Sequence, residues 1–436
     1  MNRREFTALA ASLMVSRALR PETLFAAPPA GVNGERLNRH LEELGRFGAN
    51  DGGGVSRLAY SDANKEALQA VAQWMREAGL EPAIDYTGNL IGRRAGRDRA
   101  LKPIVVGSHI DSVPDGGNYD GNVGSMAAIE VAHALAERRV RLSHPLEVAI
   151  WSNEEGGLYG SRAVSGQLEP EELRQQSRSG RTIGEGITFL GGDPARLSEV
   201  RRQRGDIAAY LEVHIEQGGI LHATHTSIGI VEGIVGIRHW DVTVTGFANH
   251  AGTTPMDERR DALLAAARFV DAVHRLVRSV PGRQVGTVGR IQAFPGAPNV
   301  IPGLVTCSLE LRDLDDAKIL SLFDGIRDEA GRIGAATGTS FAFAETLRNT
   351  PAPSDPRLRT LIGDAARGRG LSSRVMPSGA GHDAQSLAQI GPMGMIFVPS
   401  VDGVSHSPRE FSQPGDIVNG ANVLLDVVRR VDGWKG

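Results

Sequence analysis

Short apolar runs alternate along the chain with segments whose apolar residues recur every three or four positions. One such segment follows Ser61-Asp62, a pair that can cap a helix, and it continues to Gly79. The short runs are typical of strands buried on both faces of a sheet, and they lie at residues 103–107, 146–151, 211–215 and 394–398. Helices of small residues, such as residues 125–137, separate them. This alternation predicts an α/β fold with a mostly parallel sheet and helices on both faces.

The middle of the chain has a different pattern. Residues 240–245 alternate strictly between apolar and polar side chains, as in a strand with one exposed face. The following segments predict a helix, two strands, a helix and a strand, at residues 257–278, 285–294, 304–311, 315–332 and 341–347. The order β-α-β-β-α-β predicts a ferredoxin-like α+β domain at residues 237–350. We expect this domain to be inserted into a larger α/β domain, which comprises residues 33–236 and 351–436.

The amino-acid composition excludes several classes of partner and of metal site. The 436 residues include 48 Lys and Arg against 51 Asp and Glu, a net charge of −3 that favours neither nucleic acid nor an acidic membrane surface as a partner. The single cysteine, Cys307, excludes an intramolecular disulfide and a cysteine-based zinc site. Beyond the N-terminus no apolar run is long enough to anchor the chain in a membrane. Any metal site must therefore use histidines and carboxylates.

The first thirty residues have the features of an export signal. Arg3-Arg4 and Phe6 precede about ten mildly apolar residues, a pattern that matches a twin-arginine signal. The twin-arginine route carries folded proteins, which suits a protein that loads metal before export. This predicts a periplasmic location. The alternative is an ordinary cytoplasmic N-terminus, and Arg17 and Arg20 interrupt the apolar stretch.

The residues that follow the apolar runs carry the candidate chemistry. In a parallel α/β sheet, ligands bind beyond the carboxyl ends of the strands, so these side chains should meet at one edge. Imidazole and carboxylate groups there suit zinc, manganese, cobalt or nickel. Two such ions, about 3.5–4 Å apart, need a ligand that bridges them, and a carboxylate can do this where an imidazole cannot. The predicted ligands of two divalent ions are His109, Asp120, Glu155, His214 and His406, with Asp120 as the bridge.

Two further carboxylates are predicted to act beside the metals. Asp111 lies two residues after His109 and can accept the second ring N–H of that histidine, which would fix its orientation. Glu154 is adjacent to a predicted ligand and is placed to act as general base and then as proton donor. We interpret a further set of histidines as structural; they are His40, His133, His144, His222, His225, His239 and His274.

Several motifs resemble one known family. They are Gly107-Ser-His-Ile-Asp111, the Gly-Gly-x-x-Asp-Gly segment that ends at Gly121, Asn153-Glu-Glu-Gly156, His214-Ile-Glu-Gln-Gly218, Asn249-His-Ala-Gly-Thr-Thr-Pro-Met256, Ser378-Gly-Ala-Gly-His-Asp-Ala384 and Ser405-His-Ser-Pro408. Together they resemble the amidase/hydantoinase/carbamoylase branch of the dinuclear metallopeptidases, over essentially the whole chain after about residue 33. That branch includes N-carbamoyl-L-amino acid hydrolases, β-ureidopropionases and allantoate amidohydrolases. Its most specific element is His214, because related carboxypeptidases have an acidic residue there.

The resemblance implies roles for individual residues. His109 and His214 would hold one metal, Glu155 and His406 the other, and the inserted domain would act as lid and homodimer interface. The residues implied to bind substrate are Gln217, His250, Asn299, Arg312 and Gly381. A guanidinium at Arg312 can grip a substrate carboxylate with two hydrogen bonds, whereas His250 and Asn299 can donate to a developing oxyanion. Read without the resemblance, Arg312 can instead pair with Asp313 or Asp315, and Asn299 can be an ordinary loop residue between Pro298 and Pro302.

The sequence thus predicts a metal-dependent amidohydrolase that cleaves a linear, non-peptide C–N bond of an N-carbamoyl-L-amino acid or related ureido acid. Alternatives are an allantoate amidohydrolase, a dipeptidase or N-acyl-amino-acid hydrolase of the same fold, and a catalytically silent ligand-binding protein. One departure bears on substrate identity. The loop from Glu154 to Ser161 is shorter than in many relatives, and it lies beside the predicted metals.

Overall fold

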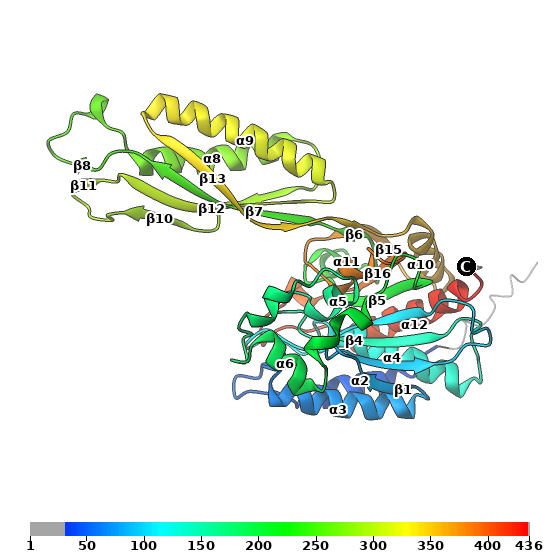
Figure 1. Ribbon diagram of the computed structural model, residues 1–436. Helices are drawn as coiled ribbons and strands as arrows, with labels where there is room; N and C mark the ends of the chain where they lie inside the picture. The colour runs from blue at the N-terminus through cyan, green and yellow to red at the C-terminus, as the bar shows by residue number, and fades with distance from the viewer. Residues whose placement is uncertain (1–30, 435–436) are drawn as a thin grey trace, which may run out of the picture. The chain divides into compact units, whose positions relative to one another are not determined.

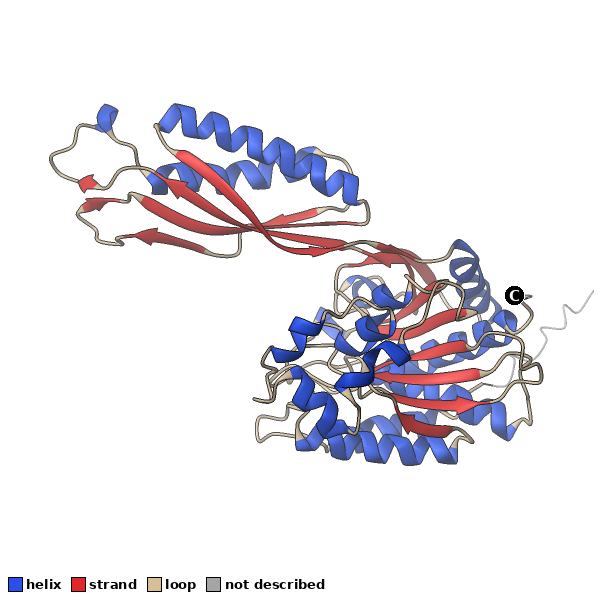
Figure 2. Cartoon of the chain, in the orientation of Figure 1, coloured by secondary structure: helices blue, strands red, loops and turns tan. Residues whose placement is uncertain are grey.

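The computed structural model describes residues 31–434, which form two large sheets with their helices (Figures 1 and 2). The predicted export signal, at residues 1–30, lies outside the described residues. Among residues 31–434, no helix is both long enough and apolar enough to cross a membrane.

The larger sheet has nine strands and is parallel at its centre. Its order is β1 (Glu81–Ile84), β2 (Leu90–Arg94), β4 (Leu146–Trp151), β3 (Ile104–His109), β5 (Ala209–Ile215), β16 (Met393–Val398), β6 (Ile228–Ile234) and β14 (Ala352–Pro353), and β15 (Ser373–Ser378) also pairs with β6. The central pairs β4–β3, β3–β5 and β5–β16 are parallel, as predicted. The pairs β1–β2, β2–β4, β16–β6 and β6–β14 are antiparallel, which makes the sheet mixed toward its edges.

Helices cover both faces of this sheet (Figure 1). The larger apolar core includes residues of α2 (Gly34–Leu44), α3 (Asp62–Glu77), α4 (Asn122–Glu137), α6 (Ile183–Leu190), α10 (Pro356–Gly368) and α12 (Pro414–Val431). A second core includes residues of α5 (Tyr159–Val164), α7 (Ile220–Ala223) and α11 (Asp383–Leu387). Strand β3 illustrates the arrangement, because Ile104 and Val106 belong to the first core and Val105 to the second. Alternate residues therefore point to opposite buried faces, which explains the continuous apolar runs.

The second large sheet comes from the middle of the chain. Its elements are β7 (Gly236–Thr245), α8 (Ala262–Ser279), β9 (Val285–Thr287), β10 (Ile291–Phe294), β12 (Leu304–Asp313), α9 (Asp316–Thr337) and β13 (Ser340–Asn349). The strand order is β10-β12-β7-β13, with β9 also paired to β12 and all pairs antiparallel. Helices α8 and α9 lie on one face of the sheet (Figure 2) and enclose a separate core with its strands. The order follows the predicted β-α-β-β-α-β arrangement with one correction: the single strand expected at residues 285–294 is two strands, β9 and β10. The domain boundaries at 237 and 350 stay a prediction.

The remaining elements are short. Strands β8 (Asn249–His250) and β11 (Val300–Ile301) form a two-stranded ladder. Within residues 31–434 there are also four 3₁₀ helices: η1 (Pro170–Arg174), η2 (Pro194–Val200), η3 (Met256–Glu258) and η4 (Val401–Gly403).

Side-chain caps fix where the predicted helices begin. Ser61 caps α3 as expected, because its hydroxyl accepts the backbone N–H of Asn64. Helix α8 begins five residues later than predicted. The carboxylate of Asp261 accepts the N–H groups of Leu263 and Leu264, so the cap lies there, and residues 256–258 form a 3₁₀ turn instead.

Candidate metal centre

The carboxyl ends of the central strands bring the predicted metal ligands together. His109 is the last residue of β3, His214 is the penultimate residue of β5, and both side chains are buried. Glu155 follows β4, and His406 lies in the loop after β16. Asp120 lies just before α4 and faces these side chains. We predicted that these side chains meet at one edge of the sheet because parallel strands end at the same edge. The central strands of the sheet are indeed parallel.

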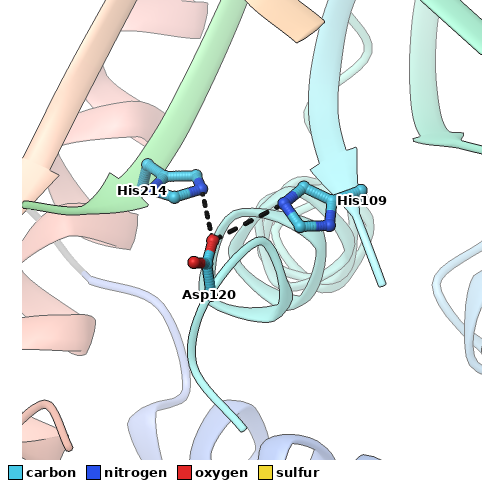
Figure 3. A group of neighbouring side chains, drawn as sticks. All are labelled: His109, Asp120 and His214. Carbon is cyan, nitrogen blue, oxygen red and sulfur yellow. Dashed lines mark ion pairs between the residues drawn. The ribbon is translucent and has the colours of Figure 1, made fainter. Parts of the chain in front are cut away.

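The carboxylate of Asp120 faces two separate sets of ligands. Its Oδ1 lies 3.1 Å from Nε2 of His214 and 3.6 Å from Nε2 of His109. Dashed lines mark these two pairs in Figure 3. Its Oδ2 lies 3.1 Å from Nε2 of His406, and that nitrogen is 3.5 Å from Oε1 of Glu155. In each set the ligand atoms lie within 4.8 Å of one another. Asp120 therefore has the position of a carboxylate that bridges two cations.

A third group of possible ligand atoms lies behind the first. It consists of Glu212, His214 and His382, all buried, and it shares His214 with the first group. The Nε2 atom of His382 is 2.8 Å from the hydroxyl of Ser378. This group therefore overlaps the centre and is not separate from it.

Burial and neighbouring charges shift the pKa values of the ionisable side chains at the centre. Burial, and next the charge of Asp120, raise the pKa of Glu155 to about 7. Burial also raises the pKa of Glu154 well above its usual range, and the neighbouring carboxylate of Glu155 adds to the effect. The hydrogen bond to Asp120 raises the pKa of His406 to about 9. The two ligand groups consist of imidazoles and carboxylates, which divalent ions prefer as ligands, and bound cations would offset the charge of the buried carboxylates, so the residues fit a pair of such ions.

Backbone carbonyls orient the two buried histidines. Nδ1 of His109 is 3.0 Å from the carbonyl oxygen of Asp111, and Nδ1 of His214 is 2.9 Å from that of Ile215. A carbonyl only accepts hydrogen bonds, so each Nδ1 carries a hydrogen, and each Nε2 is the ring nitrogen that faces Asp120 and is left to ligate a metal.

The side chain of Asp111 does something other than predicted. Its Oδ1 is 3.7 Å from Nδ1 of His109, beyond hydrogen-bond reach, so the expected contact through the carboxylate is wrong. Instead the carboxylate accepts the backbone N–H groups of Glu154 and Glu155, at 3.2 and 3.1 Å. Asp111 therefore orients His109 with its main chain and holds the loop of the acidic pair with its side chain.

Glu154 lies beside the first ligand group without belonging to either of the two groups that share Asp120. Its Oε2 is 3.7 Å from Nε2 of His109, and the side chain is buried. A carboxylate with a raised pKa at this place can accept a proton from an attacking water, which is the role predicted for it.

Gln217 joins the centre through its amide. Its Nε2 donates to Oδ2 of Asp120 at 2.6 Å, whereas its Oε1 is buried and has no hydrogen-bond partner among the described residues. A free acceptor at this point is placed to receive an N–H group of a ligand. Gly381, the other residue predicted on this side, lies in the loop between β15 and α11.

The short ladder of β8 and β11 brings His250 and Asn299 together. His250 pairs with Val300, and the N–H of Ala251 donates to the carbonyl of Asn299. Nδ1 of His250 accepts the N–H groups of Gly252 and Thr253. Its hydrogen is therefore on Nε2, where it can be donated to a ligand oxygen. Among the described residues, no hydrogen bond or ion pair links either side chain to the metal-ligand groups.

Arg312 lies at the end of β12 and is held by two acceptors. Its Nε donates to Oε1 of Glu310 at 2.6 Å, and its Nη1 donates to the carbonyl of Gly379 at 2.6 Å. Neither Asp313 nor Asp315 pairs with it, although both were alternatives from the sequence. Among residues 31–434 the Nη2 group has no hydrogen-bond partner, so it is the donor left for a substrate.

One important residue at this edge is missing from the sequence-based prediction. Glu410 is buried and accepts hydrogen bonds from the segments that carry Asp120 and His406. An acidic residue four positions after the histidine of Ser405-His-Ser-Pro408 is the signal that points to it.

Comparison with known proteins places the chain in a family. The model of the peptidase family M20/M25/M40 matches residues 105–430, a range that includes all five predicted metal ligands. The chain belongs to this family.

Its relatives match over nearly their whole length. The N-carbamoyl-L-amino-acid amidohydrolase of Pseudomonas sp. (strain NS671) is 39% identical over 405 residues, which cover 91% of this chain and 98% of that protein. The allantoate amidohydrolase of Escherichia coli (strain K12) is 33% identical over 396 residues, which cover 89% and 96%. A solved amidase of the hydantoinase/carbamoylase family from Burkholderia multivorans is 38% identical, with a TM-score of 0.87 over 94% of this chain and 100% of that one. The predicted resemblance to this branch of the M20 family is confirmed.

Proposed function

We propose that this member of the M20 family is a metal-dependent amidohydrolase that acts on an N-carbamoyl-L-amino acid or a related ureido acid. The observation that carries the proposal is the geometry of Asp120, whose two oxygens face two separate ligand sets. Such a centre is suited to hydrolysis. The ureido substrate class rests on the relatives, which are named amidohydrolases and match over nearly their full length.

The metals are proposed to be two divalent ions, with zinc and manganese as first candidates and cobalt or nickel as others. His109, His214 and Oδ1 of Asp120 would hold one ion, and Glu155, His406 and Oδ2 of Asp120 the other. When bound, such a pair polarises a carbonyl group and lowers the pKa of a water molecule.

The chain's own residues supply the proton transfers and the positioning. Glu154 takes a proton from the attacking water and returns it to the leaving nitrogen. His250 donates from Nε2 to the oxygen of the tetrahedral intermediate, and Asn299 donates beside it. Arg312 binds the substrate carboxylate, and the free Oε1 of Gln217 accepts a ureido N–H. One water and one carbamoyl amino acid then yield the amino acid, ammonia and carbon dioxide.

A panel of substrates tests the proposal. Purified protein loaded with Mn²⁺ or Zn²⁺ is offered N-carbamoyl-L-amino acids, N-carbamoyl-β-alanine and allantoate, and ammonia is measured. N-Acetyl amino acids and dipeptides are followed by amine release. We expect ammonia from a carbamoyl amino acid. Amine release from acetyl or peptide substrates alone would contradict the proposal and favour an acylase or peptidase. No turnover and no metal uptake would favour a silent binding protein.

Allantoate is the second candidate substrate. The observation that favours it is the 33% identity with the E. coli allantoate amidohydrolase over nearly the whole of both chains. Allantoate also presents ureido groups beside a carboxylate, so the roles proposed for Gln217 and Arg312 apply to it equally.

Export and assembly belong to the proposal as well. Arg3-Arg4 and Phe6 support export through the twin-arginine route to the periplasm. Replacing both arginines by lysine should retain the protein in the cytoplasm in a fractionation experiment. The inserted domain is proposed to act as a lid and as the interface of a homodimer. Exposed apolar side chains on it support the interface; they include Phe247, Met256, Leu263 and Leu264. Light scattering should give twice the mass of one chain.

A further inference from the structure

Glu410 places a buried carboxylate between the segments that carry Asp120 and His406. Its Oε1 accepts the backbone N–H groups of Tyr119 at 2.8 Å and of Asp120 at 3.0 Å. Its Oε2 accepts the hydroxyl of Ser405 at 2.8 Å and the backbone N–H of His406 at 3.3 Å. All four donors belong to Asp120, His406 or the residue just before each. One side chain thus ties both segments together.

The chain leaves room for this carboxylate at Gly117. A Cβ atom there would collide with Cβ and Oε1 of Glu410. The φ angle of Gly117 is not in the left-handed region, so an alanine is excluded by Glu410 and not by the backbone. The close approach of Gly117 is therefore a feature of the Glu410 site.

The other ligands are held by different means. His109 and His214 belong to β3 and β5, whose backbones are fixed by the parallel ladder. Glu155 is held by the carboxylate of Asp111. His406 lies in a loop with φ of +54°, a conformation that costs energy in a residue other than glycine. That strained backbone persists only where its surroundings hold it, and Glu410 accepts its N–H.

We propose that Glu410 is a positioning residue for one of the two metal positions, the one formed by Asp120, Glu155 and His406. It affects the affinity of that position more than that of the position formed by His109, Asp120 and His214, because Asp120 belongs to both positions and His406 to the first alone. All its hydrogen bonds run to donors of the protein, so Glu410 acts through Asp120 and His406 and is not itself a ligand. This inference rests on the two-metal centre of the proposed function.

The test uses the full chain, freed of metal, and Mn²⁺ alone as the probe. Mn²⁺ binding is measured by calorimetry, and electron paramagnetic resonance detects the exchange-coupled pair. In the wild type we expect two ions per chain and a coupled signal. In Glu410→Gln one binding event should stay within about twofold, and the other should lose about 10–100-fold in affinity. The coupled signal should disappear at Mn²⁺ concentrations that saturate the wild type.

Two further variants keep the test decisive. Gly117→Ala displaces the side chain of Glu410 while its charge remains, and it should cause the same selective loss. Glu130→Gln is the control, since Glu130 is also a buried carboxylate that accepts a backbone N–H, from Asn33, and it contacts no ligand segment. It should bind two Mn²⁺ ions as the wild type does. Circular dichroism of the metal-free proteins confirms that each variant is folded.

Several results would overturn the inference. They are unchanged affinity for both ions in Glu410→Gln and Gly117→Ala, equal weakening of both binding events, or the same loss in Glu130→Gln. Failure of the proposed two-metal centre has a different signature, because the wild type itself would then bind fewer than two Mn²⁺ ions.

Discussion

At the scale of single residues, neighbouring carboxylates at the metal centre have different roles. Asp120 faces both ligand sets, Glu155 belongs to one of them, and Glu154 lies beside the other without joining the pair of groups that share Asp120. Glu154 and Glu155 are adjacent in sequence, yet their environments give them different chemistry. The same substitution at each should therefore have different consequences.

Glu154→Gln is expected to remove turnover and to keep the metals. The amide cannot accept the proton of the attacking water, so kcat should fall by at least about 10²–10⁴-fold. Metal analysis should still find the wild-type content. Glu155→Gln, the matched control, should lower the metal content instead. Loss of metal in Glu154→Gln would mean that Glu154 is a ligand and that the predicted roles are wrong.

Arg312→Lys tests the grip on the substrate carboxylate. Lysine keeps the charge but loses the fork of donors, and it cannot reproduce the contacts with Glu310 and Gly379. We expect KM for an N-carbamoyl amino acid to rise about 10–100-fold, which corresponds to one hydrogen bond to a charged group. A substrate analogue without the carboxylate should respond little. If both substrates lose activity equally, Arg312 has a structural role.

Sequence identified the ligands at this scale because each one lies at the carboxyl end of an apolar strand or in the segment that follows it. The sequence did not predict the contacts that backbone groups make with these ligands. Asp111 orients His109 through a carbonyl group that every residue possesses, so no sequence pattern could assign this contact. Glu410 was missed because its partners at Tyr119 and Asp120 are almost 300 positions away, and only the fold brings them together.

At the scale of elements, local sequence determines most boundaries. The strand predicted at residues 285–294 is in fact two strands, β9 and β10, which pair with different parts of β12. Residues 288–290 interrupt them, and the hydroxyl of Ser308 accepts the N–H of Arg290 within the break. The antiparallel edges of the larger sheet were also not predicted, because strand order depends on contacts between distant segments.

Asp261→Ala tests the cap of α8. It removes the acceptor of two exposed N–H groups, at Leu263 and Leu264, and should destabilise the protein by about 1 kcal/mol. Urea unfolding measures the loss, and hydrogen exchange should locate it in the first turn of the helix. Asp271→Ala is the control on the same helix. It removes only an exposed ion pair with Arg275 and should cost at most about 0.5 kcal/mol. Equal losses in the two variants would contradict the assigned cap.

At the scale of the whole molecule, buried histidines away from the metals link folding to pH. Burial is the main reason that the pKa of His40 is lowered to about 4. The ring stacks on Trp74, and the charged or titratable groups around it are Arg39, Glu43, Glu77 and His133. Between pH 4 and about 6.5 the unfolded chain binds more protons at His40, so stability rises with pH in that window. The contribution of neutral His40 to stability is lost as the pH falls from about 6.5 toward 4.

His40→Phe should weaken this dependence. Phenylalanine keeps a ring against Trp74 and cannot take up a proton. Thermal unfolding of the metal-free protein between pH 4 and 7 should show a smaller decrease for the variant than for the wild type. His274→Phe, at an exposed position on α8, is the control and should follow the wild type. Identical pH profiles for wild type and His40→Phe would contradict the account.

The central claim is that a two-metal centre hydrolyses a ureido bond, and one measurement tests it most directly. Ammonia and free amino acid are quantified together from an N-carbamoyl-L-amino acid, with protein loaded with Mn²⁺, stripped by a chelator, and loaded again. The account predicts one ammonia per amino acid, no product after stripping, and activity restored by metal. Turnover that persists without metal, or amino acid released without ammonia, would contradict it.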